Sequence, residues 1–295
     1  MAPPRQPVVT RPMTALWERV PVIIRAILLG LLVNEVGQLG AVFIFVNLKF
    51  FPQVPWLLPA AAVWLWGFWR YVNGSGWPRS TGEARRRDLR GTPIPARVWR
   101  WSLLAGGLGL LSVIGLFLVT TRLAEIPRDA FKFPIDFSNY PPWTVVSILL
   151  VVSVVAGVAE EAGFRGYMLS QIERRHGWIA ATIITGVMFF LAHYVSHAYA
   201  TFAFLPFFLA VSALHARLVY LSRSILPSIV LHAAGDFAVA PFFLGLIGTV
   251  PSSVLKTGVD TSFMVEVALT LVFAAASIPA FRKLAEVTRQ PLESA

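Results

Sequence analysis

Long apolar blocks separated by polar connections dominate the chain. The hydrocarbon core of a bilayer needs roughly 20 consecutive apolar residues in a helix, and the chain contains about eight such blocks. They cover residues 21–48, 54–72, 101–120, 143–172, 178–197, 200–219, 225–247 and 262–281. This pattern predicts an all-α, polytopic transmembrane helix bundle with about eight membrane-spanning helices.

Lys and Arg residues gather on one side of the predicted topology. With the N-terminus placed inside, the inner connections and tails hold 18 Lys and Arg residues, and the outer connections hold five. Cytoplasmic connections carry such an excess, so the chain is predicted to be N-in and C-in with an even number of helices. We divide it into a cytosolic tail (1–20), one membrane domain (21–281) and a second cytosolic tail (282–295).

Composition agrees with a membrane protein and narrows its partners. Hydrophobic residues make up 56% of the chain and charged residues 14%, whereas soluble proteins usually have about 25% charged residues. The net charge is +10, and most of the Lys and Arg residues lie between the apolar blocks. We therefore expect contact with membrane lipids and not with nucleic acid. The Ala-, Val-, Arg- and Trp-rich composition is typical of bacteria and predicts the inner (cytoplasmic) membrane.

Ionisable residues inside the apolar blocks are the candidates for chemistry. Each is costly in hydrocarbon unless it is paired or faces a polar cavity, so each is a functional hypothesis. The fourth block contains Glu160, Glu161 and Arg165, the fifth contains His193, and the seventh contains His232 and Asp236.

Helix geometry predicts two pairs within single helices. Glu161 and Arg165 are four residues apart, so they share a face and can form an ion pair. His232 and Asp236 have the same spacing. Glu160 is rotated by about 100° from Glu161 and faces a different neighbour.

A hairpin brings the fourth and fifth blocks together. The polar residues Arg175–Gly177 separate the two blocks and mark the turn. Glu160 and His193 lie at nearly equal distances from this turn, so they are predicted to sit at the same depth in the bundle.

Two hydrolytic chemistries suit a glutamate beside histidines. Glu160 can act as general base on a water that His193 orients, while a second histidine stabilises an oxyanion. Alternatively, Glu160, His193 and His232 can ligate a divalent metal such as Zn²⁺ and leave a position open for the water. The chain has no Cys nucleophile and no Gly-x-Ser-x-Gly elbow, and no other cofactor is expected.

The polar clusters resemble the motifs of a known family. Glu-Glu-x-x-x-Arg (160–165), Phe-x-x-x-His (189–193) and His-x-x-x-Asp (232–236) occur in the order and spacing of the CAAX protease and bacteriocin-processing (CPBP) family. Pro227, five residues before His232, adds to the likeness. These are intramembrane endopeptidases related to the type II CAAX prenyl endopeptidases. The resemblance covers a catalytic core at about 143–240.

The resemblance implies a role for each matched residue. Glu160 would activate the hydrolytic water with the help of His193, and Glu161 and Arg165 would organise the first motif. His232 and Asp236 would stabilise the oxyanion. The family often has Asn where this chain has Asp236. An ionised Asp cannot donate a hydrogen bond to an oxyanion, whereas a protonated one can.

Other polar residues have simpler interpretations. We expect Asn34, Glu35 and Gln38 to form interhelical hydrogen bonds, and His215 to be solvated near a cytoplasmic end. His197 lies near the outer end of its block and needs no functional explanation. The cluster Arg85–Arg90 is interpreted as a topology determinant.

The leading hypothesis is an intramembrane endopeptidase that cleaves a membrane-associated protein or peptide from a site opening toward the cytosol. The alternative is a catalytically silent scaffold or immunity protein that binds a partner membrane protein through the same cavity. A transporter is disfavoured because the chain has no internal repeat.

Overall fold

The computed structural model describes residues 17–124, 136–196, 201–243 and 252–289. In this part of the chain all regular structure is helical. The longer helices are α2 (Val22–Gln38), α3 (Val42–Phe50), α4 (Leu57–Val72), α5 (Gly82–Leu89), α6 (Ala96–Leu123), α7 (Pro142–Glu160), α8 (Leu169–Ser196), α9 (Leu205–Ser222), α10 (Leu226–Phe243) and α12 (Thr261–Arg289). Shorter pieces are η1 (Leu39–Ala41), η2 (Arg79–Thr81), η4 (Phe137–Asn139), η5 (Glu161–Met168), η6 (Phe202–Phe204) and α11 (Val254–Thr257).

Five helical segments in the described part are long and apolar enough to cross a membrane. They are Val22–Phe50, Ala96–Leu123, Pro142–Val195, Phe202–Ser222 and Thr261–Arg289. The prediction of an all-helical protein is confirmed, and these segments indicate an integral membrane protein. α4 and α10 are helices where the sequence predicts them, but both have fewer than 20 residues.

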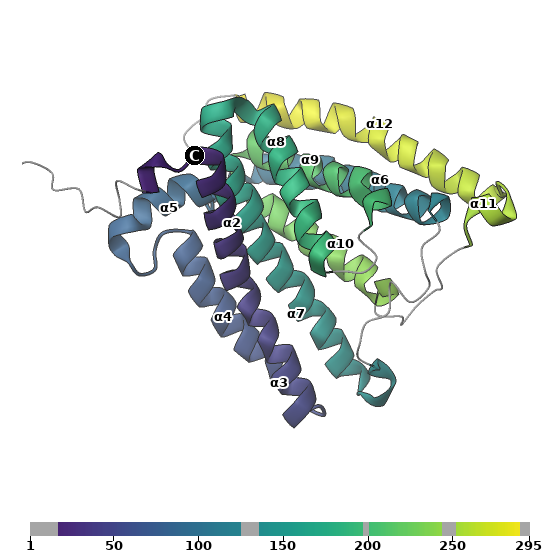
Figure 1. Cartoon of the computed structure of the whole chain (residues 1–295), viewed down its shortest axis with the longest axis horizontal. Helices are drawn as coiled ribbons and strands as arrows, with labels where there is room; N and C mark the ends of the chain where they lie inside the picture. Colours follow the sequence, from purple (N-terminus) through teal and green to yellow (C-terminus); the bar gives the residue numbers. More distant parts are fainter. Residues whose placement is uncertain (1–16, 125–135, 197–200, 244–251, 290–295) are drawn as a thin grey trace, which may run out of the picture.

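The 54-residue segment Pro142–Val195 contains two of the predicted blocks. Its chain turns back at Gly177, whose φ of 81° and ψ of 164° are not helical (Figure 1). A positive φ favours glycine, so Gly177 allows the reversal that the sequence places at Arg175–Gly177. The predicted hairpin is therefore present.

Helix α7 and its continuation η5 lie at the centre of the bundle (Figure 1). α10 packs along α7, and α2 crosses η5. α6 packs against α9 and α12 on the other side of α10, and Ser112 of α6 donates a hydrogen bond to the Thr270 carbonyl of α12 at 3.0 Å. The residues that connect α7 to α8 thus contact the earlier helices α2 and α5 and the later helix α9.

Small residues allow the closest of these helix crossings. A Cβ atom on Gly163 of η5 would lie 2.6 Å from the Gly30 carbonyl oxygen of α2. A Cβ atom on Gly157 of α7 would lie 3.1 Å from backbone atoms of α10. Van der Waals packing drives helix association in a bilayer, and it requires this kind of close approach.

Replacing Gly163 with Ala should therefore destabilise the bundle. The added methyl group must push α2 away from η5, and overpacking of this kind costs about 1–3 kcal/mol. The free energy of unfolding in a denaturing-detergent titration measures the loss. Gly67→Ala is the control, because a Cβ atom on Gly67 meets open space. Equal stability of the two variants would contradict the close crossing.

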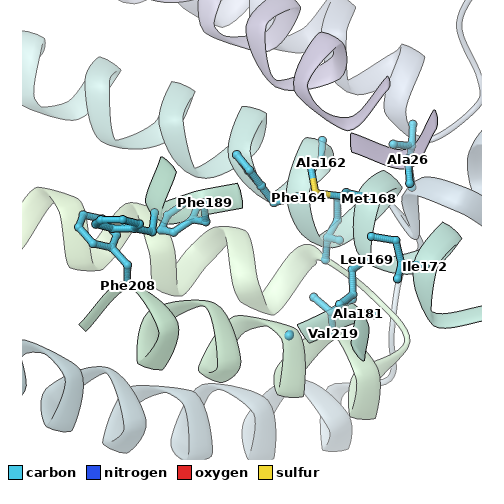
Figure 2. Packing of buried hydrophobic residues seen from close by; sticks show 14 of the residues in the cluster. Ala26, Ala162, Phe164, Met168, Leu169, Ile172, Ala181, Phe189, Phe208 and Val219 are labelled. Atoms are coloured by element: carbon cyan, nitrogen blue, oxygen red, sulfur yellow. The ribbon is translucent and has the colours of Figure 1, made fainter. Parts of the chain in front are cut away.

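Aromatic side chains fill the interior next to η5. Phe164 and Phe189 meet edge to face, with ring centroids 5.2 Å apart at 89°. Figure 2 shows Phe189 beside Phe208, at one end of a buried cluster that continues through Phe164 and Met168. This apolar packing fixes the helices that carry the polar residues.

The arginine-rich connection after α4 is folded against the bundle. Arg85 is buried and donates hydrogen bonds to the carbonyls of Gly76 and Pro78, each at 2.8 Å. The Asp88 carboxylate accepts from Gln171 and Arg174 of α8, each at 2.9 Å. The segment is therefore more than a determinant of membrane topology, because Arg85 and Asp88 also form hydrogen bonds that hold the folded structure together.

Candidate active site

The segment η5 departs from the α-helix that the sequence predicts. Residues Glu161–Met168 form a π-helix between α7 and α8. π-Helical turns inside longer helices occur frequently at functional sites. Glu160 is the last residue of α7 and Glu161 the first of η5, so the change in winding falls between the two glutamates of the first motif.

Glu161 is the centre of a buried polar network. Its side chain is fully buried, and its carboxylate lies 3.1 Å from the Arg165 guanidinium. The Ser228 hydroxyl of α10 donates to Glu161 Oε2 at 2.6 Å, and His232 Nδ1 lies 2.8 Å from Oε1. The predicted Glu161–Arg165 pair is present, and it also joins η5 to α10.

Arg165 balances the charge of this network. Its side chain is completely buried, and its guanidinium lies over the Phe189 ring at 4.3 Å from the centroid. Among the described residues the guanidinium nitrogens form no hydrogen bond. The ion pair with Glu161 and the ring face therefore hold the cation, and removing either charge would leave the other buried and uncompensated.

His232 connects the network to Glu160 and Asp236. Since Nδ1 faces Glu161, Nε2 is the nitrogen that faces the other two carboxylates. It lies 3.4 Å from Glu160 Oε2 and 3.6 Å from Asp236 Oδ2. Both distances are longer than a normal hydrogen bond. The predicted proximity of His232 and Asp236 on one helix face is confirmed.

One oxygen of Glu160 has a partner and the other does not. Gln38 of α2 donates to Glu160 Oε1 at 3.2 Å. Glu160 Oε2 is buried and accepts no hydrogen bond from the described residues. A buried oxygen without a partner is costly, and this one lies on the wall of a cavity.

The cavity has a volume of about 120 Å³, and four of the predicted site residues lie on its wall: Glu160, His193, His232 and Asp236. A void of this kind holds a water once it reaches about 10–15 Å³ and offers polar partners. His215 also lies on the wall, and apolar residues of α6, α8, α9 and α10 form the rest of it. The site therefore has room for water between a carboxylate and histidines.

His193 is oriented by its own helix and by aromatic rings. Its Nδ1 lies 2.9 Å from the Phe189 carbonyl oxygen. Its ring centroid is 4.5 Å from that of Phe189 and 4.8 Å from that of Phe208. These contacts hold the ring at the cavity. His197, the other histidine of this block, lies outside the described residues.

The expectation that His215 is solvated is wrong. The residue is 1% exposed, and its Nδ1 lies 2.7 Å from the Ser228 hydroxyl oxygen. Its ring centroid is 5.2 Å from that of His232. α9 continues to Ser222, so His215 lies about two turns inside the helix end and packs against the network. The sequence could have indicated this burial, because an ionisable group within an apolar block is costly unless it is paired or faces a polar cavity.

Of the three polar residues in the first block, Gln38 reaches the site. Its bond to Glu160 confirms the predicted interhelical hydrogen bonding for this residue. Asn34 instead donates to the neighbouring Glu35 at 3.1 Å, within its own helix.

Two overlapping groups of side chains could ligate a metal. One ligand atom each from Glu161, His215 and His232 lie within 4.8 Å of one another. However, the Arg165 guanidinium already neutralises Glu161, and a second cation there would be repelled. This group fits an internal ion-pair network better than a metal.

The predicted metal ligands Glu160, His193 and His232 line one cavity, but among the described residues they do not form a group whose ligand atoms all lie within 4.8 Å of one another. They combine oxygen and nitrogen donors as zinc sites do, and Glu160 Oε2 lacks a hydrogen-bond donor among the described residues. The placement of His193 Nδ1 at a backbone carbonyl is also typical of metal-bound histidines. A metal at these three residues stays a prediction.

Comparison with protein-family profiles gives a match to part of the chain. The profile described as type II CAAX prenyl endopeptidase Rce1-like matches residues 142–238. This segment is an Rce1-like domain of the CPBP family. It contains all three motifs and ends two residues after Asp236. Neither the curated proteins nor the solved structures contain a significant match to the chain.

The match of this segment to a protease family implies a protein or peptide substrate. The buried cluster of Glu161, His215 and His232 is consistent with an active site of this family. Gln38 and the helix that carries it lie outside the matched segment.

Proposed function

We propose that this protein is an intramembrane endopeptidase that hydrolyses a peptide bond in a membrane-associated protein or peptide. The observation that carries the proposal is the carboxylate of Glu160. One of its oxygens is held by Gln38, and the other lies at a cavity wall with His232 Nε2 at 3.4 Å. This geometry suits a general base acting on a water.

In the proposed reaction Glu160 removes a proton from the water as the water oxygen bonds to the scissile carbonyl carbon. The negative charge that develops on the carbonyl oxygen is stabilised by a hydrogen-bond donor from a protonated His232 or Asp236. The proton on Glu160 then passes to the leaving nitrogen as the carbon–nitrogen bond breaks. Glu161 keeps His232 in position through Nδ1.

A divalent metal would be held by Glu160, His193 and His232. It would polarise the water and the substrate carbonyl. With or without a metal, Glu161 holds the ring of His232 through Nδ1, and Arg165 neutralises Glu161.

The proposed membrane arrangement has about eight helices, with both termini in the cytosol. The five long segments, the hairpin at Gly177 and the shorter helices α4 and α10 are compatible with this count. The catalytic core at about 143–240 would then lie within one membrane domain of residues 21–281, with its site opening toward the cytosol.

A catalogue of protein N-termini in membranes tests the proposal. Cells that produce the wild-type protein are compared with cells that produce Glu160→Gln at an equal level. N-termini that disappear in the variant identify the substrate and the cleaved bond. Glu83→Gln, on the exposed surface of α5, is the matched control and should retain them. Identical catalogues would contradict proteolysis and favour the scaffold.

Gln38 is proposed to position the catalytic carboxylate. Gln38→Ala should lower kcat by about tenfold, because a hydrogen bond to a charged group contributes roughly 1.5–3 kcal/mol. KM should change little, since Gln38 is not among the residues that line the cavity. Steady-state kinetics on the identified substrate measure both constants.

Asn34→Ala is the control for Gln38, one helical turn away. Asn34 bonds to Glu35 and not to Glu160, so its replacement should leave kcat unchanged. A Gln38→Ala variant whose kcat equals that of Asn34→Ala would remove Gln38 from the site.

A further inference from the structure

A second cavity lies outside the proposed active site, between α9 and the C-terminal half of α12. Its volume is about 570 Å³. Its lining includes Arg217 of α9, and Ile278, Phe281, Arg282, Glu286 and Arg289 of α12. Residues 278, 282, 285 and 289 of α12 recur at intervals of three or four, so they share one face of the helix. We call this cavity the basic groove.

Three arginines in the basic groove have no acidic partner within the part of the chain that the structure describes. Among the described residues, Arg217, Arg282 and Arg289 form neither an ion pair nor a hydrogen bond. Glu286, the acidic residue of the groove, pairs with Lys283 at 2.9 Å. The groove therefore presents an excess of positive charge that the described residues do not neutralise.

Aromatic rings hold Arg217 in place. Trp178 of α8 and Tyr220 of α9 stack with ring centroids 5.5 Å apart. The Arg217 guanidinium lies over both rings, at 5.3 Å and 5.7 Å from their centroids. A guanidinium held in this way loses less conformational freedom when it binds an anion, and its planar fork matches phosphate oxygens.

The groove lies where the apolar surface of the bundle gives way to polar residues. α12 exposes large apolar side chains along its length, among them Leu271, Val272 and Ile278. Arginines follow from position 282 onward. Trp and Tyr, which flank the groove here, are enriched at the membrane–water interface. Figure 1 shows this end of α12 near the start of α8, on the same side of the molecule as the turn at Gly177.

We propose that the basic groove binds the phosphate headgroup of an anionic phospholipid from the surrounding bilayer. Arg217, Arg282 and Arg289 bind the phosphate, and Ile278 and Phe281 contact the start of an acyl chain. Basic pockets between helices at the cytoplasmic side are suited to such headgroups. A lipid bound there would join α9, which carries His215 and the cavity residue Phe208, to α12.

Titration of the full-length protein in detergent with short-chain phosphatidylglycerol tests the proposal, with binding followed by native mass spectrometry. Arg282→Gln/Arg289→Gln should weaken binding by about 25-fold, since each arginine near a lipid surface contributes roughly a factor of five. Arg79→Gln/Arg175→Gln removes the same charge from exposed positions outside the groove and should bind within about twofold of the wild type.

Several results would overturn the lipid site. Equal losses in the two double variants would show diffuse attraction to charge, and equal binding of phosphatidylcholine would show that anionic charge is not recognised. Displacement of the lipid by an equal concentration of inorganic phosphate would assign the groove to free phosphate. Arg282→Lys/Arg289→Lys keeps the charge and should bind with intermediate affinity, which separates recognition from any effect on folding.

Discussion

Replacing Glu160 with Gln is expected to abolish peptide cleavage while leaving the fold intact. The amide cannot take a proton from water, and loss of a general base reduces rates by about 10²–10⁴-fold. Its carbonyl oxygen can still accept the hydrogen bond from Gln38, so the geometry is retained. The cleavage rate of the purified protein on its identified substrate measures the loss.

The neighbouring residue provides the contrast for Glu160. Glu161 binds Arg165, Ser228 and His232, so Glu161→Gln should lower the free energy of unfolding as well as the rate. A Glu160→Gln variant with normal cleavage would exclude Glu160 as the base. If Glu160→Gln is as unstable as Glu161→Gln, then Glu160 has a structural role.

Replacing Arg165 with Met should cause the largest loss of stability. The change leaves the fully buried Glu161 carboxylate without its counter-ion, and removal of one partner of a buried ion pair costs about 3–5 kcal/mol. The free energy of unfolding in a denaturing-detergent titration measures the effect. Arg175→Met is the control, since Arg175 is exposed and lies in α8, the helix that follows η5.

A double variant separates charge compensation from packing. Glu161→Gln/Arg165→Met removes both charges, so it should be more stable than Arg165→Met alone. If the stability that the double variant loses relative to the wild type equals the sum of the two single losses, the two side chains act independently. That result would contradict the central ion pair of the network.

The sequence predicts much of the fold and of the site because local rules apply to both. Apolar length predicts the helices, and the four-residue spacing predicts the Glu161–Arg165 pair. The positive φ at Gly177 lies where polar residues separate two apolar blocks. The motifs of the CPBP family lead to four residues that line one cavity: Glu160, His193, His232 and Asp236.

Features that depend on contacts between distant segments were not predictable in the same way. The π-helix η5 packs against α2, α5 and α8, and the four-residue periodicity of its sequence predicts an ordinary α-helix. Gln38 meets Glu160 across 122 positions of sequence. His215 was misplaced because α9 reaches further than its apolar block.

The segment that the family profile matches packs against helices that lie outside it. Gly163 packs against the backbone of Gly30, and Ser170 donates to the Asp88 carbonyl at 2.6 Å. Both partners precede residue 142, where the match begins. The Rce1-like segment is thus not a portable module, and a chimera carrying residues 142–238 alone would place its glutamates against a foreign surface. A chimera designed to carry the active site should therefore include the N-terminal helices as well.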